Sequence, residues 1–313
     1  MGIQREKERA RMRQYITDFM NEYELGPRER VAIAIAYERI NEAAEARDRF
    51  QRILSGYDKN TDYITPELIS EVELIAKAAG VHLYTAELVT CIALTRMLRV
   101  RLAQLGVSKK SISLTVADFT YKIKECEEMY GIVGIDVWSW YTKFFSLRIV
   151  AFGRLQFEVR EYSGGTYKKG DKVLKNGDTA LSVHIPRNGE PLDEKLCNRA
   201  YKEAKAFFCK LLGVEDIAFM CISWLLYEKN REFLPPTSNI VKFMNRYDIV
   251  ETIPSADIAS APIKFIFLRE NDTPISELPR ESSLQRAYAE LMENGGLPGC
   301  GKGVFFLQEA QKA

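Results

Sequence analysis

The spacing of apolar residues changes near residue 146, and this change restricts the chain to a fold with two differently built halves. Before it, apolar residues recur every three or four positions, as between Ile33 and Ala44, which predicts amphipathic helices. After it, apolar and polar residues alternate, as between Leu155 and Val159, which predicts a strand with one polar face. We therefore expect an α+β chain with a helical domain over residues 1–145 and a mixed α/β domain over residues 146–313.

Several residues indicate where helices begin and end in the first half. Pro27 suits the first position of a helix, and Thr65-Pro66-Glu67 combines a capping threonine with a proline at the start of another. Gly80 is a typical helix stop. Thr115 and Asp118 have the spacing of a capping box, so we expect a helix to begin there.

Turn residues and apolar runs predict the strands of the second half. Asn176-Gly177 is a hairpin signal between two short strands. The run Ile217–Leu226 is apolar on both faces, as expected of a central strand. Ser282 and Gln285 have capping-box spacing at the start of a late helix. Further strands are expected at Tyr247–Ile253, Ile263–Leu268 and Val304–Leu307.

Composition narrows the function classes. The formal net charge is +1, so nothing favours nucleic acid or a membrane surface as a partner. No apolar run reaches the roughly 18–20 residues of a membrane helix, and no secretory signal opens the chain. The six cysteines lack metal-ligand and redox spacing, which favours reduced thiols and a cytoplasmic location. The two histidines are far apart in sequence, so we expect no metal site.

The run Gly296–Gly303 matches the G-x-x-x-x-G-K pattern of a phosphate-binding loop. However, Gly303 stands where such a loop needs Ser or Thr to hold Mg²⁺. The order is also reversed, because a helix is expected before the run and a strand after it. A glycine-rich turn is therefore the favoured interpretation.

Two strands carry polar residues suited to acid–base chemistry. His184 lies on the polar face of one predicted strand and could act as a general base, since an imidazole titrates near neutrality. A hydrogen-bonded structural histidine is the alternative. Arg154, Gln156 and Glu158 share one face of another strand by its period of two, and could line a polar cleft. A solvated edge strand explains the same pattern.

Other candidates are weaker. Ser223 lacks the G-x-S-x-G elbow of a hydrolase nucleophile, and core packing accounts for Trp224 beside it. Arg187 is one of several basic residues around the loop and helix that follow His184, where free amides could meet an anion. Asp193 at the predicted cap of that helix would occupy the same amides.

Five segments in this order resemble a bacterial family of acyltransferase-like proteins. Members of that family pair a helical N-terminal domain with a C-terminal domain similar to the GNAT fold, that of the N-acetyltransferase superfamily. The resemblance covers about residues 147–308 well and the helical half more loosely. It implies a largely antiparallel central sheet in the second half. The segments are 148–158, 183–192, 223–226, 234–241 and 282–287.

The resemblance implies transfer of an acyl group from acetyl-CoA or another acyl-CoA to an amine or similar small nucleophile, without a metal. In such folds two central strands splay apart and the pantetheine arm enters the gap. His184 or Glu158 would then be the base. The cofactor-binding candidates are Arg187, Asn188 and Gly189, and the substrate-binding candidates are Arg154, Gln156, Ser223, Trp224 and Asn239.

A second hypothesis stays open. The superfamily's pyrophosphate loop reads roughly Q/R-x-x-G-x-G/A at a helix start, whereas the turn after His184 contains only Gly189. This departure favours a non-catalytic ligand-binding or interaction module on the same fold. The helical half could select the acceptor or form a homo-oligomer interface.

Overall fold

The computed structural model describes residues 2–254 and 261–307. The chain divides into two compact units, Met1–Val150 and Ala151–Ala313. The fold class predicted from the sequence is confirmed, with helices first and a mixed α/β arrangement second. In the described ranges no single helix is long and apolar enough to cross a membrane. One pair of helical segments, 66–79 with 83–104, has the length and composition of a membrane span when the two are taken together, but the pair is bent by 113°.

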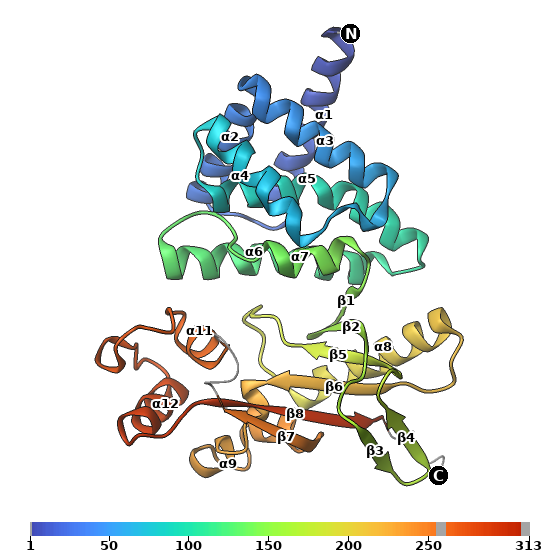
Figure 1. The fold of residues 1–313 in the computed structure, drawn as a ribbon, viewed down its shortest axis with the longest axis vertical. Helices are drawn as coiled ribbons and strands as arrows, with labels where there is room; N and C mark the ends of the chain where they lie inside the picture. Colours follow the sequence, from blue (N-terminus) through green and yellow to red (C-terminus); the bar gives the residue numbers. More distant parts are fainter. Residues whose placement is uncertain (1, 255–260, 308–313) are drawn as a thin grey trace. The chain divides into compact units, whose positions relative to one another are not determined.

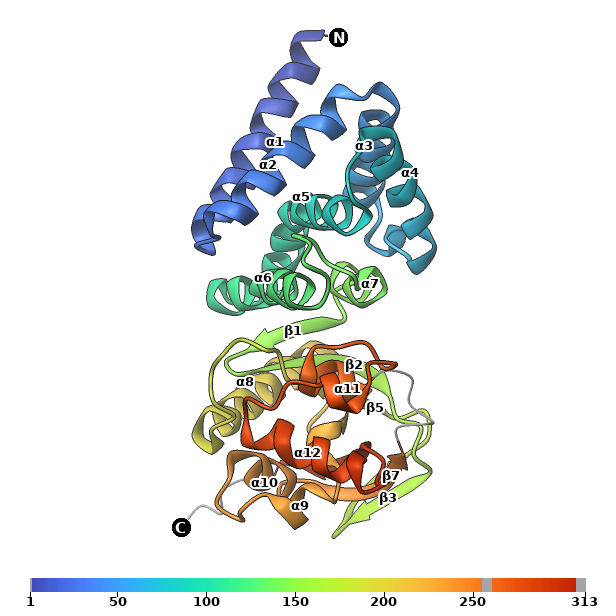
Figure 2. The same ribbon diagram turned by 90° about the vertical axis from the view of Figure 1, so that its left-hand side faces the viewer.

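The helical unit is built from α-helices that pack around a shared core, with α1 and α2 side by side (Figure 2). Helix α5 contacts most of the others and is therefore the centre of the unit. Two short 3₁₀ helices, η1 (Thr61–Tyr63) and η2 (Pro66–Leu68), precede α4. The α-helices are α1 (Gly2–Glu22), α2 (Pro27–Glu42), α3 (Ala44–Lys59), α4 (Ile69–Ala79), α5 (Leu83–Gln104), α6 (Lys109–Tyr130) and α7 (Trp138–Phe145).

The helix boundaries follow the sequence signals with two exceptions. At Thr65-Pro66-Glu67 only the 3₁₀ helix η2 begins, without a side-chain cap from Thr65, and α4 begins at Ile69. Helix α2 begins at Pro27, and Gly80 ends α4 in the left-handed conformation, as predicted. The predicted start at Thr115 is wrong, because α6 begins at Lys109 with Ser108 as its cap. The Thr115 hydroxyl instead donates to the carbonyl of Ser111 one turn earlier, an alternative open to threonine inside a helix.

The aromatic helix α7 packs into the core of this unit. The Tyr141 ring stacks on Phe119 of α6 with centroids 4.0 Å apart. The indole of Trp138 donates to the carbonyl of Thr65 at 3.0 Å. The Tyr57 hydroxyl of α3 donates to the carbonyl of Phe145 at 2.9 Å. Buried aromatic rings with their polar ends satisfied are strong contributors to a core.

The second unit contains a six-stranded sheet of order β1-β2-β5-β6-β8-β7 and a separate two-stranded sheet, β3-β4 (Figure 1). The strands are β1 (Ile149–Phe152), β2 (Leu155–Glu161), β3 (Thr166–Lys169), β4 (Lys172–Lys175), β5 (Thr179–His184), β6 (Ala218–Ser223), β7 (Asp248–Pro254) and β8 (Gly299–Phe306). The helices are α8 (Glu194–Leu212), α9 (Asn230–Phe233), α10 (Asn239–Met244), α11 (Ala261–Phe267) and α12 (Ser283–Glu293), with 3₁₀ helices η3 (Trp224–Leu226) and η4 (Ile275–Glu277).

Helix α8 covers one face of the six-stranded sheet, which we call the helix face. Tyr201 of α8 is fully buried there and packs edge-on against Phe157, Phe219 and Phe305, each from a different strand. Its hydroxyl forms a 2.6 Å hydrogen bond with that of Tyr247. The helix face is therefore an apolar core sealed by aromatic packing.

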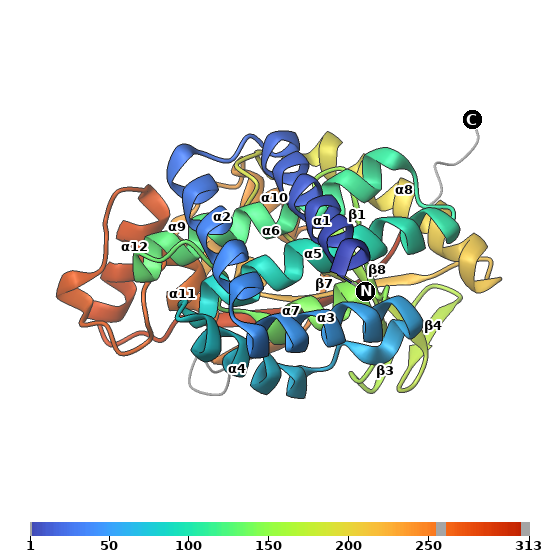
Figure 3. The same ribbon diagram turned by 90° about the horizontal axis from the view of Figure 1, so that it is seen from above.

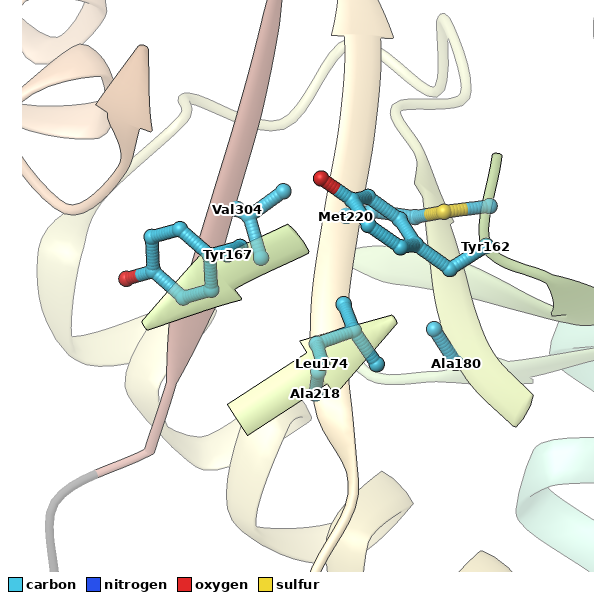
Figure 4. Close-up of a cluster of buried hydrophobic side chains, with 7 residues drawn as sticks. All are labelled: Tyr162, Tyr167, Leu174, Ala180, Ala218, Met220 and Val304. Atoms are coloured by element: carbon cyan, nitrogen blue, oxygen red, sulfur yellow. The ribbon is translucent and has the colours of Figure 1, made fainter. Parts of the chain in front are cut away.

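The β3–β4 hairpin lies on the opposite face, which we call the hairpin face (Figure 3). Figure 4 shows the apolar cluster that it covers, with Tyr167 and Leu174 of the hairpin packed over Ala218 and Met220 of β6. The Asn176-Gly177 turn exists, but the predicted hairpin around it is wrong. Strand β4 pairs with β3 and not with β5, which joins the larger sheet.

Three further predictions need correction. Residues predicted as a strand at Ile263–Leu268 form helix α11, because a short apolar run does not distinguish helix from strand. The central strand expected at Ile217–Leu226 ends at Ser223, and the 3₁₀ helix η3 follows it. The last strand begins at Gly299 rather than Val304, so the glycine-rich run is mostly strand and not a turn.

Candidate functional site

The two central strands β5 and β6 separate at their carboxyl ends. They run parallel, and their paired residues extend only from Ala180 with Ala218 to Ser182 with Met220. Strand β5 nevertheless continues to His184 and β6 continues to Ser223. The last residues of β5 and β6 therefore do not pair with each other, and this leaves a gap in the middle of the sheet.

Glu158 and His184 meet beside this gap. Strands β2 and β5 pair antiparallel, with Gln156 opposite His184 and Glu158 opposite Ser182. These residues share the hairpin face, and the His184 Nε2 lies 3.0 Å from the Glu158 Oε2. Glu158 is 1% exposed, while the His184 side chain is partly exposed.

This arrangement suits a general base. A buried carboxylate that accepts a hydrogen bond from Nε2 fixes the orientation of the imidazole ring. The same contact stabilises the imidazolium that forms when the ring takes up a proton. The chain thus joins two residues that the sequence suggested as separate candidates.

Arg154 holds the loop that follows β5. Its Nε donates to the carbonyls of Glu190 at 3.0 Å and Pro191 at 3.3 Å, and its Nη1 donates to that of Pro186 at 2.9 Å. The guanidinium is buried, so these bonds to three carbonyls fix the loop firmly. In this structure Arg154 positions the loop beside the gap.

The predicted cofactor-binding residues Arg187, Asn188 and Gly189 lie in this loop. The Asn188 side chain accepts from the Glu190 N–H at 3.1 Å, which makes a tight turn with Gly189 at φ +78°. Asp193 caps α8, as predicted, by accepting from the backbone N–H groups of the second and third residues after it at 2.9 and 3.1 Å. The amides that could hold a phosphate already have a carboxylate partner.

A small pocket lies between α8 and α10. It is shallow and open to solvent, and two of its lining residues are the basic side chains Lys242 and Arg246. The Arg246 guanidinium stacks over the ring of Tyr201 at 5.1 Å, and its buried Nε has no hydrogen-bond acceptor among the described residues. A buried guanidinium nitrogen without a partner favours an anionic ligand at this position. The remaining lining residues are Leu192, Glu194, Cys197 and Phe243.

The remaining predicted site residues lie at the carboxyl end of β6 and beyond it. The Ser223 hydroxyl accepts from the Leu225 N–H at 3.1 Å and so caps η3. Trp224 packs edge-on against Tyr288 of α12. Asn239 is exposed at the start of α10. The substrate-binding role of these three residues stays a prediction.

Lys242 and Arg246 were missed at the sequence level. They lie on and just after a short helix that was recognised, but nothing in their spacing indicated that they border α8. No group of three or more His, Cys, Asp or Glu side chains in the described part of the chain has a geometry that could hold a metal ion.

The sequence matches two protein families over adjacent ranges. Residues 149–305 match the GNAT-like C-terminal domain, and residues 14–147 match the N-acyltransferase N-terminal domain. The chain therefore belongs to the family of GNAT-like C-terminal domain proteins and carries the associated helical domain in front of it, as the resemblance in the sequence implied.

Solved structures with the same architecture include an acyltransferase mutant in complex with octanoyl-CoA, at a TM-score of 0.72 and 20% identity. An acyltransferase in complex with decanoyl-CoA and teicoplanin matches with a TM-score of 0.71 and 20% identity. Both alignments cover 93% of this chain and 87% of the other. At this identity the likeness shows a shared fold. No curated protein matches the chain.

Proposed function

We propose that this protein is an acyltransferase that moves an acyl group from acyl-CoA to an amine or similar small nucleophile. The observation that carries the proposal is the early end of the β5–β6 pairing at Ser182 and Met220. A thioester tail needs such an opening between strands, and the Glu158–His184 pair lies at its edge. The fold shared with acyltransferases in complex with acyl-CoA supports the same reaction.

In the proposed reaction the acceptor nitrogen attacks the thioester carbonyl carbon. The His184 imidazole takes the proton from the nitrogen, and Glu158 stabilises the imidazolium that results. The carbon–sulfur bond then breaks, and the CoA sulfur leaves and takes the proton from His184. Positioning of the two reactants supplies much of the remaining acceleration.

The basic side chains beside the first turn of α8 suit the phosphates of CoA better than the capped amides of that turn. Asp193 occupies the first amides of α8, so a diphosphate gains little there. Lys242 and Arg246 offer two cationic groups, one with an unpaired buried nitrogen. We infer that these two residues bind the CoA phosphates, and that Arg187, Asn188 and Gly189 border the pantetheine.

Calorimetry with CoA, acetyl-CoA and octanoyl-CoA tests the proposal. Binding of an acyl-CoA by the unmodified protein is expected, and Arg246→Ala or Lys242→Ala should weaken it by about tenfold, as loss of a charge-assisted bond does. Lys210→Ala is a matched control, because Lys210 is exposed at the far end of α8. Absence of binding at millimolar acyl-CoA would contradict the acyltransferase proposal.

A non-catalytic ligand-binding module is the second candidate. The Asp193 cap favours it, because a superfamily member that uses CoA normally presents free amides at this helix start. The two proposals differ in turnover. Ligand binding without release of CoA, for every amine offered, would support the module.

Two coarser assignments go with the proposed function. We propose residues 1–145 as a helical domain that helps to select the acceptor, and residues 146–313 as the transferase domain. All six cysteines are free thiols, which supports a cytoplasmic location. Size-exclusion chromatography with light scattering would show whether a homo-oligomer forms.

A further inference from the structure

Alternating glycines place Lys302 on the hairpin face of β8. A Cβ atom at Gly299, Gly301 or Gly303 would collide on the other side with Tyr227, the Leu226 carbonyl or Tyr247 respectively, the closest approach being 2.1 Å at Gly301. The glycines therefore allow η3 and its surroundings to press against β8. The residues between them, including Lys302, point to the opposite face by the period of the strand.

The side chain of Lys302 is buried, and its polar contacts to the described residues are long. Lys302 is 8% exposed, yet its Nζ lies 3.5 Å from the Ser163 carbonyl and 3.7 Å from the Glu251 carboxylate. Charge-assisted hydrogen bonds are normally about 2.7–2.9 Å long. The third neighbour is the Tyr162 ring, whose centroid is 5.7 Å away. A desolvated cation with only long contacts is costly, and an anion that fits the space would offset that cost.

Lys302 also lies in register with the candidate site. Its cross-strand partner on β6 is Ile222, which belongs to the separated end of that strand. Ile222 is 48% exposed, so this part of the hairpin face is open. His184 lies on the same face one strand beyond the gap, at least about two strand spacings or 10 Å from Lys302.

We propose that Lys302 binds a carboxylate of the acceptor, so that the preferred acceptor is an amine that also carries an anionic group. This proposal rests on the acyltransferase function, because it places the acceptor between Lys302 and His184. The amine approaches His184 while the carboxylate pairs with the ammonium group of Lys302, whose contacts to the Ser163 carbonyl and the Glu251 carboxylate are long.

The experiment compares matched acceptors: glycine, β-alanine and 4-aminobutyrate, each against its primary amide, with octanoyl-CoA as donor and CoA release as the readout. The unmodified protein should prefer the carboxylate member of the best pair by about tenfold or more in kcat/KM. Lys302→Met should reduce this ratio towards one through a higher KM, and Lys302→Arg should restore part of it. Glu251→Gln should lower the KM for the carboxylates, because a competing anion is removed.

Separate outcomes identify the source of a failure. If Lys302→Met lowers acyl-CoA affinity in calorimetry, the anion is a CoA phosphate and the acceptor proposal is wrong. Equal loss of transfer to both members of each pair would assign Lys302 a structural role. If the unmodified protein shows no transfer at all, thermal shifts with the three amino acids still decide the matter. Stabilisation that disappears in Lys302→Met supports the carboxylate site, whereas no stabilisation overturns it.

Discussion

Both units of this protein bury glutamates, and Glu158 and Glu87 differ in their partners. Glu158 in the sheet unit lies 3.0 Å from His184 beside the gap between β5 and β6. Glu87 in α5 of the helical unit is 3% exposed, and its Oε2 has no hydrogen-bond partner among the described residues. Burial alone therefore does not indicate a functional site, whereas burial together with a basic partner at a strand opening supports the proposed one.

The surroundings of Glu87 on balance favour the protonated form of its carboxyl group. Burial, followed by the nearby carboxylates of Asp136 and Glu73, raises the pKa of Glu87 to about 8, and a hydrogen bond from the Trp138 backbone opposes this only in part. The carboxyl group is thus neutral at pH 7. We interpret Glu87 as a structural group of the helical core, and its effect on the free energy of unfolding depends on pH.

The largest expected effect is loss of activity on substitution at the sheet pair. His184→Ala should reduce kcat by about 10²–10⁴-fold, because the proton of the attacking nucleophile loses its acceptor. Glu158→Gln should reduce kcat less while the protein stays folded. Rates of CoA release and far-UV circular dichroism measure both properties. Arg160→Gln is the control, because Arg160 is exposed on β2 two residues after Glu158. Equal activity of His184→Ala and Arg160→Gln would contradict a catalytic role for the Glu158–His184 pair.

The second prediction concerns the pH dependence of stability. Because the pKa of Glu87 is raised from 4.5 to about 8, the folded state keeps a proton that the unfolded state releases. Its contribution is complete below about pH 4.5 and is lost as the pH rises towards 8. Glu87→Gln should remove this loss, which amounts to at most ~1.4 kcal/mol per pH unit.

Urea unfolding of the unmodified protein and of Glu87→Gln between pH 5 and 9 measures that difference. The free energies of unfolding should diverge with rising pH, with Glu87→Gln the more stable at pH 8. Parallel curves would mean that Glu87 is ionised or partnered in the folded protein, and the two glutamates would then resemble each other. Glu73→Gln is a second variant to measure. It removes a carboxylate that raises the pKa of Glu87, so the free energy of unfolding should depend less steeply on pH.

The smallest expected effect involves a third carboxylate, the cap of α8. Asp193→Ala should lower stability by about 1 kcal/mol, since the two N–H groups lose their acceptor. The same change should strengthen CoA binding, because the freed amides can meet a phosphate. Thermal unfolding and calorimetry report the two quantities. Weaker CoA binding in this variant would show that Asp193 contributes to the site rather than blocking it.

Local signals in the sequence predicted the local structure well. The change of period near residue 146 separated helices from strands, and Ser282 with Gln285 forms the capping box that their spacing indicated. The errors come from short apolar runs and from strand pairing. Ile263–Leu268 contains too few residues to show a period, and the hairpin partner of β4 depends on contacts far from its own turn.

The candidate site was only partly readable for the same reason. His184 and Glu158 were identified singly, but their contact depends on the β2–β5 register, which no short motif encodes. Lys302 was assigned to a glycine-rich turn, although the alternate spacing of Gly299, Gly301 and Gly303 is also that of a strand pressed against a neighbour on one side. Lys242 and Arg246 are brought to the candidate site by the packing of α10 beside α8, which their local sequence does not encode.

The short β5–β6 ladder has a mechanical consequence. It divides the six strands into two groups of three, β1-β2-β5 and β6-β8-β7, joined by only three residue pairs. The sheet should flex most easily at this boundary between the two groups. The amide groups of a bound pantetheine tail could bond to both groups and hold them together. Backbone amides that face this boundary beyond Ser182 and Met220 should thus exchange hydrogen faster than those that face it within the ladder, and should slow when acyl-CoA is added.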